Sequence, residues 1–422
     1  MDTKFDRRDF LKDAALTVSA WNLVPWDLPN WMPRLAFAPA GQAPTGDVLV
    51  CIFMRGGVDG LSVVTPHGDS NYFNLRPKIA IPDTQGGNDN TIIDLDGFFG
   101  LHPALRPLKD IWDAGNLAIV HAAGSPDPTH SHFDAMDYME RGTPGEKKLA
   151  TGWIARHLQT VSRQNNSPFR AVGMGTLLQA SLQGPVQATV LKSITDFHLK
   201  GRADEITQIQ KELASLYNLD APLEAQANLT WNAIETLAKI NPQIYTPANG
   251  AVYPSTAYGM GLQQVAQLIK GQVGLEVACV DIGGWDTHSA EGVIDGTLPR
   301  LLDEFGKGLA AFYQDLGNLT AQLTLVTMSE FGRRCYENGS EGTDHGHGNM
   351  MFIMGGGIKG GKVYGKWPGL AKDQLYGPGD LNITTDFRDV LAEIVQNRMK
   401  NPKLDQVFPD YQPQMLGLTK TT

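Results

Sequence analysis

The chain reads Val48-Leu49-Val50-Cys51-Ile52-Phe53-Met54 and then Arg55-Gly56-Gly57-Val58-Asp59-Gly60, an apolar run that ends in a glycine-rich turn. Such a run, bounded by glycine, is typical of a strand that is buried on both faces of a parallel sheet. Further runs of this kind predict strands over Leu117–His121, Phe169–Val172, Leu275–Asp281, Leu323–Met328 and Met351–Met354. We therefore expect an α/β fold with a mostly parallel central sheet.

Amphipathic segments lie between these runs, with apolar residues three or four positions apart, which indicates helices packed on the sheet. The clearest are Ala203–Leu216, Ala225–Ile240, Gly261–Lys270, Leu298–Leu316 and Thr385–Gln396. Three helical patterns follow one another between about 201 and 270 without a strand, so we expect a helical insertion there. No Pro-, Ser- or charge-rich linker divides residues 41–422, which favours a single large domain.

The N-terminus carries the pattern of a twin-arginine export signal, Arg7-Arg8-Asp9-Phe10-Leu11-Lys12. The apolar segment that follows, 14–24, is shorter than the roughly 20 residues of a membrane-spanning helix. Ala38-Pro39-Ala40 fits a cleavage site, which places the mature start near Gly41. We therefore expect a signal peptide over 1–40, recognition by the twin-arginine translocase, a periplasmic or extracellular location, and no integral membrane span after cleavage.

Composition excludes two classes of function. The net charge of −10 argues against a nucleic-acid partner, which would need a basic surface. Three scattered cysteines supply neither an iron–sulfur site nor a disulfide framework. Gly355-x-Gly357-x-x-Gly360 matches a dinucleotide-binding pattern, but the sequence after it does not predict the helix that this motif requires.

Open α/β sheets place functional loops at the carboxyl ends of their strands. After the first predicted strand comes Asp59, which could approach a ligand or could belong to an ordinary turn. After the second comes Ser131, at the start of a predicted helix. A serine there could attack a phosphoryl or sulfuryl group held at the helix N-terminus, or it could only cap the helix.

The segment after the strand at 275–281 contains Asp286 and His288. In extended chain these two side chains face the same way, so they could share a metal ion or form a structural hydrogen bond. Glu330 and Arg333 follow the strand at 323–328, and an arginine there could bind an oxyanion or form an exposed ion pair. His345 and His347 follow within a glycine-rich loop.

Together these motifs resemble the alkaline phosphatase and sulfatase superfamily, and more closely the twin-arginine-exported family known as Domain of Unknown Function 1501. The resemblance rests on Arg-Gly-Gly-Val-Asp-Gly-Leu from Arg55, Ser-His-Phe from Ser131, Gly-Gly-Trp-Asp-Thr-His from Gly283, Ser-Glu-Phe-Gly-Arg from Ser329, and Thr-Asp-His-Gly from Thr343. It implies a three-layer α/β/α fold, an exported metal-dependent hydrolase and a small anionic phosphate or sulfate ester as substrate.

The resemblance also implies roles for individual residues. Asp59 would bridge one metal, Ser131 would be the nucleophile, Asp286, His288 and His345 would hold the other metal, and Arg55 or Arg333 would neutralise the anion. Glu330 stands where the superfamily has an aspartate ligand and can replace it as a metal ligand, but Phe331 cannot replace the histidine that follows. The metal ion that this histidine would bind is then expected to be bound more weakly, to be absent, or to be held by His347, His130 or His132 instead.

Two functions therefore follow from the sequence. One is ester hydrolysis with one or two divalent ions, of zinc, manganese, magnesium or calcium. The other is a secreted binding or structural protein that has kept the scaffold and lost catalysis.

Overall fold

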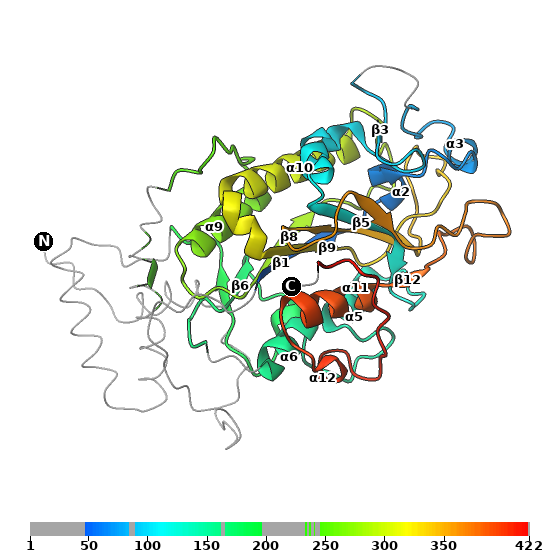
Figure 1. Cartoon of the computed structure of the whole chain (residues 1–422). Coiled ribbons are helices and arrows are strands. Elements are labelled where there is room, and N and C mark those ends of the chain that lie inside the picture. Colours follow the sequence, from blue (N-terminus) through cyan, green and yellow to red (C-terminus); the bar gives the residue numbers. More distant parts are fainter. Residues whose placement is uncertain are drawn as a thin grey trace, which may run out of the picture.

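The computed structural model describes residues 47–83, 89–161, 165–195, 233, 236, 237, 240 and 245–420 (Figure 1). The predicted export signal and the predicted helix Ala203–Leu216 lie outside these residues, and so does nearly all of Ala225–Ile240. The signal and the helical insertion therefore stay predictions.

A large mixed sheet forms the centre of the molecule, with the strand order β11-β5-β10-β9-β1-β8-β6-β7, and β12 pairs with β5 beyond this path. Its strands are β1 (Val48–Arg55), β5 (Leu117–Gly124), β6 (Ala171–Met174), β7 (Thr189–Leu191), β8 (Val277–Gly283), β9 (Leu323–Met328), β10 (Asn349–Met354), β11 (Lys362–Tyr364) and β12 (Thr385–Asp386). Only β10 runs antiparallel to its neighbours, β5 and β9. The prediction of a mostly parallel sheet is therefore confirmed, and every predicted strand overlaps an observed one.

The first strand shows why the fold has three layers. Val48, Val50, Ile52 and Met54 contribute to one apolar core, which they share with residues of α9 and α10. Leu49, Cys51 and Phe53 alternate with them and contribute to a second core, with residues of α5, α6 and α11. Alternate side chains of a strand face opposite sides of the sheet, so an uninterrupted apolar run needs helices on both sides. Figure 1 shows this arrangement, with α9 and α10 on one side and α5, α6, α11 and α12 on the other.

The helices and smaller elements connect these strands. Helices and helical turns are α2 (Gly60–Val63), α3 (Asn71–Leu75), η3 (Pro103–Leu108), α4 (Lys109–Asp113), α5 (His132–Arg141), α6 (Trp153–Thr160), η4 (Ala180–Leu182), α9 (Ala257–Lys270), α10 (Thr297–Leu316), η6 (Gly317–Gln322), α11 (Phe387–Glu393), η7 (Ile394–Arg398) and α12 (Leu404–Val407). A second sheet has the order β2-β4-β3, with β2 (Val64–Thr65), β4 (Gly100–Leu101) and β3 (Ile93–Asp94).

The predicted helix Thr385–Gln396 needs a correction. Thr385 and Asp386 belong to the short strand β12, and Asp386 then accepts a hydrogen bond from the backbone N–H of Arg388 as the N-cap of α11. The helix continues as the π-helical turn η7. An aspartate side chain that satisfies a free N–H group marks the start of a helix, and this local signal outweighs the apolar periodicity before it.

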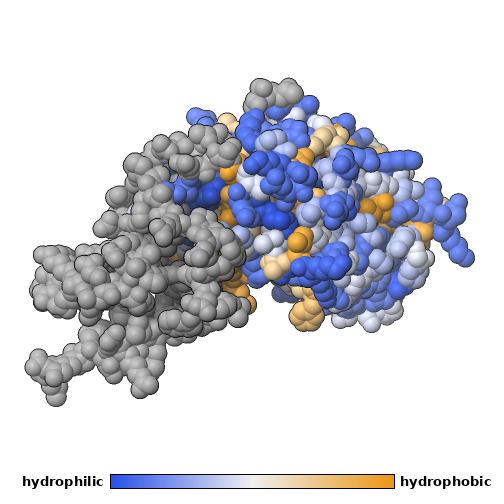
Figure 2. Space-filling view, turned by 90° about the horizontal axis from the view of Figure 1, so that it is seen from below, coloured by the Kyte–Doolittle hydropathy of each residue, from blue (hydrophilic) through white to orange (hydrophobic). Residues whose placement is uncertain are grey.

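One face of the described residues is mostly polar. Figure 2 shows a face on which hydrophilic side chains predominate and apolar ones are scattered among them. Among the described residues, no helix combines the length and the apolar character needed to cross a membrane.

Candidate metal centre

A cluster of polar side chains lies at the carboxyl edge of the sheet. Because β1 lies between β8 and β9, the segments that follow these three strands meet there. The turn after β1 comes very close to the segment after β8: a Cβ on Gly56, whose φ is +122°, would lie 2.7 Å from the backbone nitrogen of Asp286. Glycine alone fits this contact and this backbone angle without strain. The turn thereby fixes the position of Asp286.

Four side chains bring potential metal ligands together: Asp286, His288, His345 and His132. Asp286 Oδ1 lies 3.1 Å from His288 Nε2 and 3.2 Å from His345 Nε2, and these two nitrogens are 3.0 Å apart. His132 is the first residue of α5, and its Nε2 lies 3.6 Å from Asp286 Oδ2. Asp286, His345 and His132 each offer a ligand atom within 4.8 Å of the other two. His288, which the sequence predicted as a ligand of the same ion as Asp286 and His345, joins this group through its contacts with these two residues.

Each of the three histidines uses its other ring nitrogen to contact an oxygen. The Nδ1 atom of His132 lies 2.8 Å from a Glu330 carboxylate oxygen, that of His288 lies 3.3 Å from Asp344, and that of His345 lies 3.0 Å from the His130 carbonyl. A carbonyl or ionised carboxylate oxygen can only accept, so Nδ1 is the donor in each pair. In a neutral ring with this orientation, the lone pair lies on Nε2. Histidines that ligate metals are usually oriented in this way.

These residues fit a metal ion. The Nε2 atom of His132 is buried and has no hydrogen-bond partner among the described residues. The Nε2 atoms of His288 and His345 are 3.0 Å apart, a separation that fits two ligands of one metal ion and also a hydrogen bond from one ring to the other. With metal–nitrogen bonds of about 2.0–2.1 Å, tetrahedral ligand atoms stand about 3.3 Å apart, close to the separations found here.

Arg333 supports this cluster and does not face the solvent. Its buried guanidinium donates to Asp286 Oδ1 at 2.6 Å, to the Trp285 and Thr343 carbonyls at 3.0 Å each, and to the carbonyls of the turn after β1. Burial raises the pKa of Asp286, but the hydrogen bond and the charge of Arg333 outweigh it, so the pKa lies below its ordinary value. All five acceptors are protein groups. This geometry gives Arg333 a positioning role, and the predicted contact with a substrate anion would require it to leave these acceptors.

Glu330 lies behind His132. Its carboxylate accepts hydrogen bonds from the backbone N–H of Gly56 at 2.8 Å and from the Ser329 hydroxyl at 3.3 Å, besides its contact with His132. The hydrogen bond to Glu330 is the largest influence on the pKa of His132 and raises it. The structure therefore places Glu330 where it orients a ligand, whereas the sequence suggested that it is itself a ligand.

Phe331 occupies the space beside this pair. Its buried ring lies 4.8 Å from the ring centre of His132 and 4.7 Å from that of His345. Of the three histidines that could compensate for Phe331, His132 is the one whose ring nitrogen reaches the cluster. His347 instead stacks on Tyr376 at 4.5 Å, and burial lowers its pKa to about 4.

Asp59 takes a different partner. Its buried carboxylate pairs with both terminal nitrogens of Arg76, one of them at 2.9 Å, and Arg76 also donates to the Ser62 hydroxyl at 2.9 Å. An ion pair of this geometry satisfies both carboxylate oxygens. The structure does not bring Asp59 into the histidine cluster, so its predicted role as a bridging ligand has no support from this geometry.

Ser131 and Arg55 lie outside the cluster formed by Asp286 and the three histidines. Ser131 is the N-cap of α5, and its Oγ accepts a long hydrogen bond from the backbone N–H of Asp134 at 3.4 Å. Arg55 pairs with Glu140 at 3.3 Å and with Asp281 at 2.9 Å, and its side chain remains 26% exposed. Both residues retain access to solvent, so their predicted catalytic roles stay open.

Sequence reasoning gave no role to Asp344 or Arg76. Asp344 stands in the quoted Thr-Asp-His-Gly motif, where its position beside His345 was a signal. Arg76 follows no predicted strand, and nothing in the sequence links it to Asp59.

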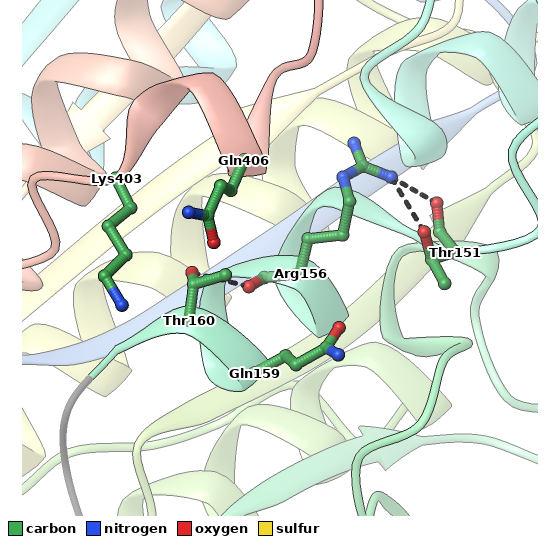
Figure 3. A pocket seen from close by; sticks show the side chains of 6 residues that line it. All are labelled: Thr151, Arg156, Gln159, Thr160, Lys403 and Gln406. Atoms are coloured by element: carbon green, nitrogen blue, oxygen red, sulfur yellow. Dashed lines mark hydrogen bonds between the residues drawn. The ribbon is translucent and has the colours of Figure 1, made fainter. Parts of the chain in front are cut away.

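A separate hollow of about 310 Å³ lies between α6 and α12 (Figure 3). Arg156 is its most conspicuous cation, but Figure 3 shows its guanidinium directed toward Thr151. This group also donates to the carbonyls of Arg141 and Val407, the last residues of α5 and α12. Carbonyls at helix C-termini stabilise a positive charge. Arg156 therefore joins three helices and is not free to bind a ligand.

The chain belongs to the family described as "Protein of unknown function (DUF1501)", whose model matches residues 118–403. This confirms the resemblance drawn from the motifs, and it leaves β1 and Asp59 outside the matched range. No curated protein matches the chain.

Two solved structures are similar to it. The lipoteichoic acid synthase LtaP from Listeria monocytogenes has 8% sequence identity and a TM-score of 0.34, over 89% of this chain and 75% of that one. A protein in the alkaline phosphatase superfamily from Vibrio parahaemolyticus has 12% identity and a TM-score of 0.31, over 83% and 69%. At such TM-scores these likenesses say nothing about the chemistry of the present site.

Proposed function

We propose that this protein is an exported, metal-dependent hydrolase of phosphate or sulfate esters. The observation that carries the proposal is the cluster of His132, Asp286, His288 and His345, in which three histidines are oriented through Nδ1 and direct Nε2 toward the Asp286 carboxylate. Two of its members remain accessible, since the side chains of Asp286 and His288 are 47% and 44% exposed. A small substrate could therefore reach the cluster from solvent.

The donor set favours a transition metal over magnesium or calcium, because imidazole nitrogen suits zinc, manganese or iron, whereas magnesium and calcium prefer oxygen. A bound divalent ion would polarise the ester oxygens and lower the pKa of an attacking hydroxyl or water. The protein side chains perform the remaining tasks. Arg333 holds Asp286 in place, and Glu330 and Asp344 hold the rings of His132 and His288.

The attacking oxygen in this proposal is Ser131 Oγ or a water molecule. Ser131 directly precedes the ligand His132, and its hydroxyl accepts a long hydrogen bond, of 3.4 Å, from the helix that it caps. The N-terminus of α5 directs its first backbone N–H groups and the positive end of its dipole toward an anion bound there. Arg55, whose side chain is 26% exposed, could assist, whereas Arg333 is buried among protein acceptors.

The location and the partners belong to the same proposal. The twin-arginine pattern at Arg7-Arg8 supports passage through the twin-arginine translocase to the periplasm or the exterior. This route carries proteins that are already folded, as the resemblance implies, so the metal could be loaded before export.

One observation favours a second candidate function, a secreted binding or structural protein with a metal but no catalysis. Phe331 packs against the rings of both His132 and His345 and fills space next to the cluster. A filled site of this kind could keep a structural ion and admit no ester.

The test is a metal analysis of purified mature protein together with nitrophenyl phosphate and sulfate assays, with and without chelator. The variants are Asp286→Ala, Ser131→Ala and, as a control, His67→Ala, whose side chain pairs with Asp94 in an exposed contact. We expect Asp286→Ala to lose turnover and the metal ion that this cluster binds. Bound metal without turnover of any ester would favour the second function. Metal-dependent turnover that survives Ser131→Ala would assign the attack to water.

A further inference from the structure

Asp380 is a buried carboxylate that the proposed centre does not use. Its residue is 0% exposed, and neither carboxylate oxygen has a hydrogen bond to any described residue. Buried polar atoms are nearly always paired, so two orphan oxygens on one carboxylate point to an ion or water that belongs there. The ionisable side chains in contact with this carboxylate are His130, with Nε2 3.3 Å from Oδ2, and Arg334, with Nε 3.9 Å from Oδ1.

The His130 Nε2 atom and the Asp380 Oδ2 atom do not form a hydrogen bond, but they are as far apart as two ligand atoms of one metal ion. At 3.3 Å, the Nε2 and Oδ2 atoms are as far apart as two ligands of one metal with bonds near 2.0–2.1 Å, roughly 3.3 Å. The His130 side chain is 33% exposed, so an ion could reach Asp380 from this side.

The backbone around Asp380 is well fixed. Its N–H donates to the Tyr376 carbonyl at 2.9 Å, and the Tyr376 N–H donates back to the Asp380 carbonyl at 2.9 Å. The neighbouring Gly379 carbonyl accepts from the Cys335 N–H at 3.0 Å. Hydrogen bonds of the backbone therefore fix the loop that carries the unpaired Asp380 carboxylate.

We propose that His130 Nε2 and the Asp380 carboxylate hold a second divalent cation, separate from the cluster of Asp286 and its three histidines. One imidazole and one carboxylate suit manganese or zinc, with water in the remaining positions. Arg334 does not block this ion, because it faces the other carboxylate oxygen and directs its Nη1 to the Tyr336 hydroxyl. The His130 carbonyl also receives the hydrogen bond from His345 Nδ1, so this site adjoins the first.

A competing explanation is that Asp380 serves only as the counter-ion of Arg334 and of a protonated His130. The two explanations differ in metal stoichiometry, which does not depend on any hydrolytic activity. The proposal can therefore fail while the proposed function stands, and the reverse is also true.

The experiment strips metal from the purified protein with chelator, dialyses it against excess Mn²⁺ and, separately, Zn²⁺, and counts ions per chain after removal of the free metal. We expect two ions for the wild type and one for His130→Ala and for Asp380→Asn. The control His67→Ala, which removes a histidine paired with Asp94 at 3.0 Å, should keep two. His130→Ala retains the backbone carbonyl that supports His345, and circular dichroism checks that each variant is folded.

Asp286→Ala identifies which ion remains. We expect it to keep the ion of His130 and Asp380, and a double variant with His130→Ala to bind none. The proposal is overturned if His130→Ala and Asp380→Asn bind as many ions as the wild type, or if Asp286→Ala alone removes all bound metal.

Discussion

Replacing Arg333 by lysine should test whether the Arg333 guanidinium holds the candidate metal centre in place. The guanidinium donates to four backbone carbonyls, of Gly56, Gly57, Trp285 and Thr343, and to the carboxylate of Asp286. Lysine keeps the charge but has a single nitrogen with three N–H groups, which cannot reach acceptors spread around a planar fork.

The magnitude follows from the contacts that are lost. At least two of the five acceptors are left without a donor in a buried place, and each costs about 1–3 kcal/mol. The metal-free protein should therefore lose about 2–6 kcal/mol of unfolding free energy. Asp286 loses the partner that orients it, so the affinity for metal should fall by about 10–100-fold.

Urea unfolding in chelator measures the first effect, and metal titration measures the second. Arg334→Lys is the matched control, because the neighbouring arginine is 24% exposed and should tolerate the change within about 1 kcal/mol. A loss below about 1 kcal/mol in Arg333→Lys, with unchanged metal affinity, would refute the view that Arg333 holds the centre together.

Three further results are expected. Glu330→Gln should weaken metal binding about tenfold, because the amide orients His132 less well than the carboxylate. The raised pKa of His132 also stabilises the metal-free wild type relative to Glu330→Gln. This advantage should be complete below about pH 6.5 and should shrink as the pH rises through the raised value, so unfolding curves with the opposite trend would contradict the assignment. Asp59→Asn should cost about 3–5 kcal/mol by removing the negative charge that pairs with the buried Arg76 guanidinium, while metal content stays constant. Loss of metal without loss of stability would make Asp59 a ligand after all. Burial raises the pKa of Cys335 to about 12, so a thiol reagent should label it only after unfolding, and rapid labelling of the native protein would contradict the buried position.

Local patterns in the sequence were enough to predict the central strands. The expected strand Leu323–Met328 coincides with β9, and Val48–Met54 is one residue shorter than β1. Apolar runs of this length are stable only when both faces are covered, so they also predicted the helices around the sheet. The direction of β10 was not predictable, because an apolar run reads the same in a parallel and an antiparallel pair.

The pairing of charges depended on contacts between distant segments. Asp286 and His288 are two residues apart, so the sequence could predict that they meet. His132 and Glu330 are 198 positions apart, and their contact exists only because α5 begins beside the end of β9. Asp59 looked like a ligand because it follows a strand, but Arg76 neutralises it in the buried interior.

By itself, the sequence determined the layered α/β fold, the membership of the family and the proximity of the Asp286 and His288 side chains, because each rests on residues close together in the chain. Tertiary structure alone decided that His132 completes the cluster, that Glu330 orients it and that Arg333 is buried support. These roles depend on the strand order β9-β1-β8, which brings the ends of three distant segments to one edge of the sheet and leaves each charged side chain with the partner that compensates its burial.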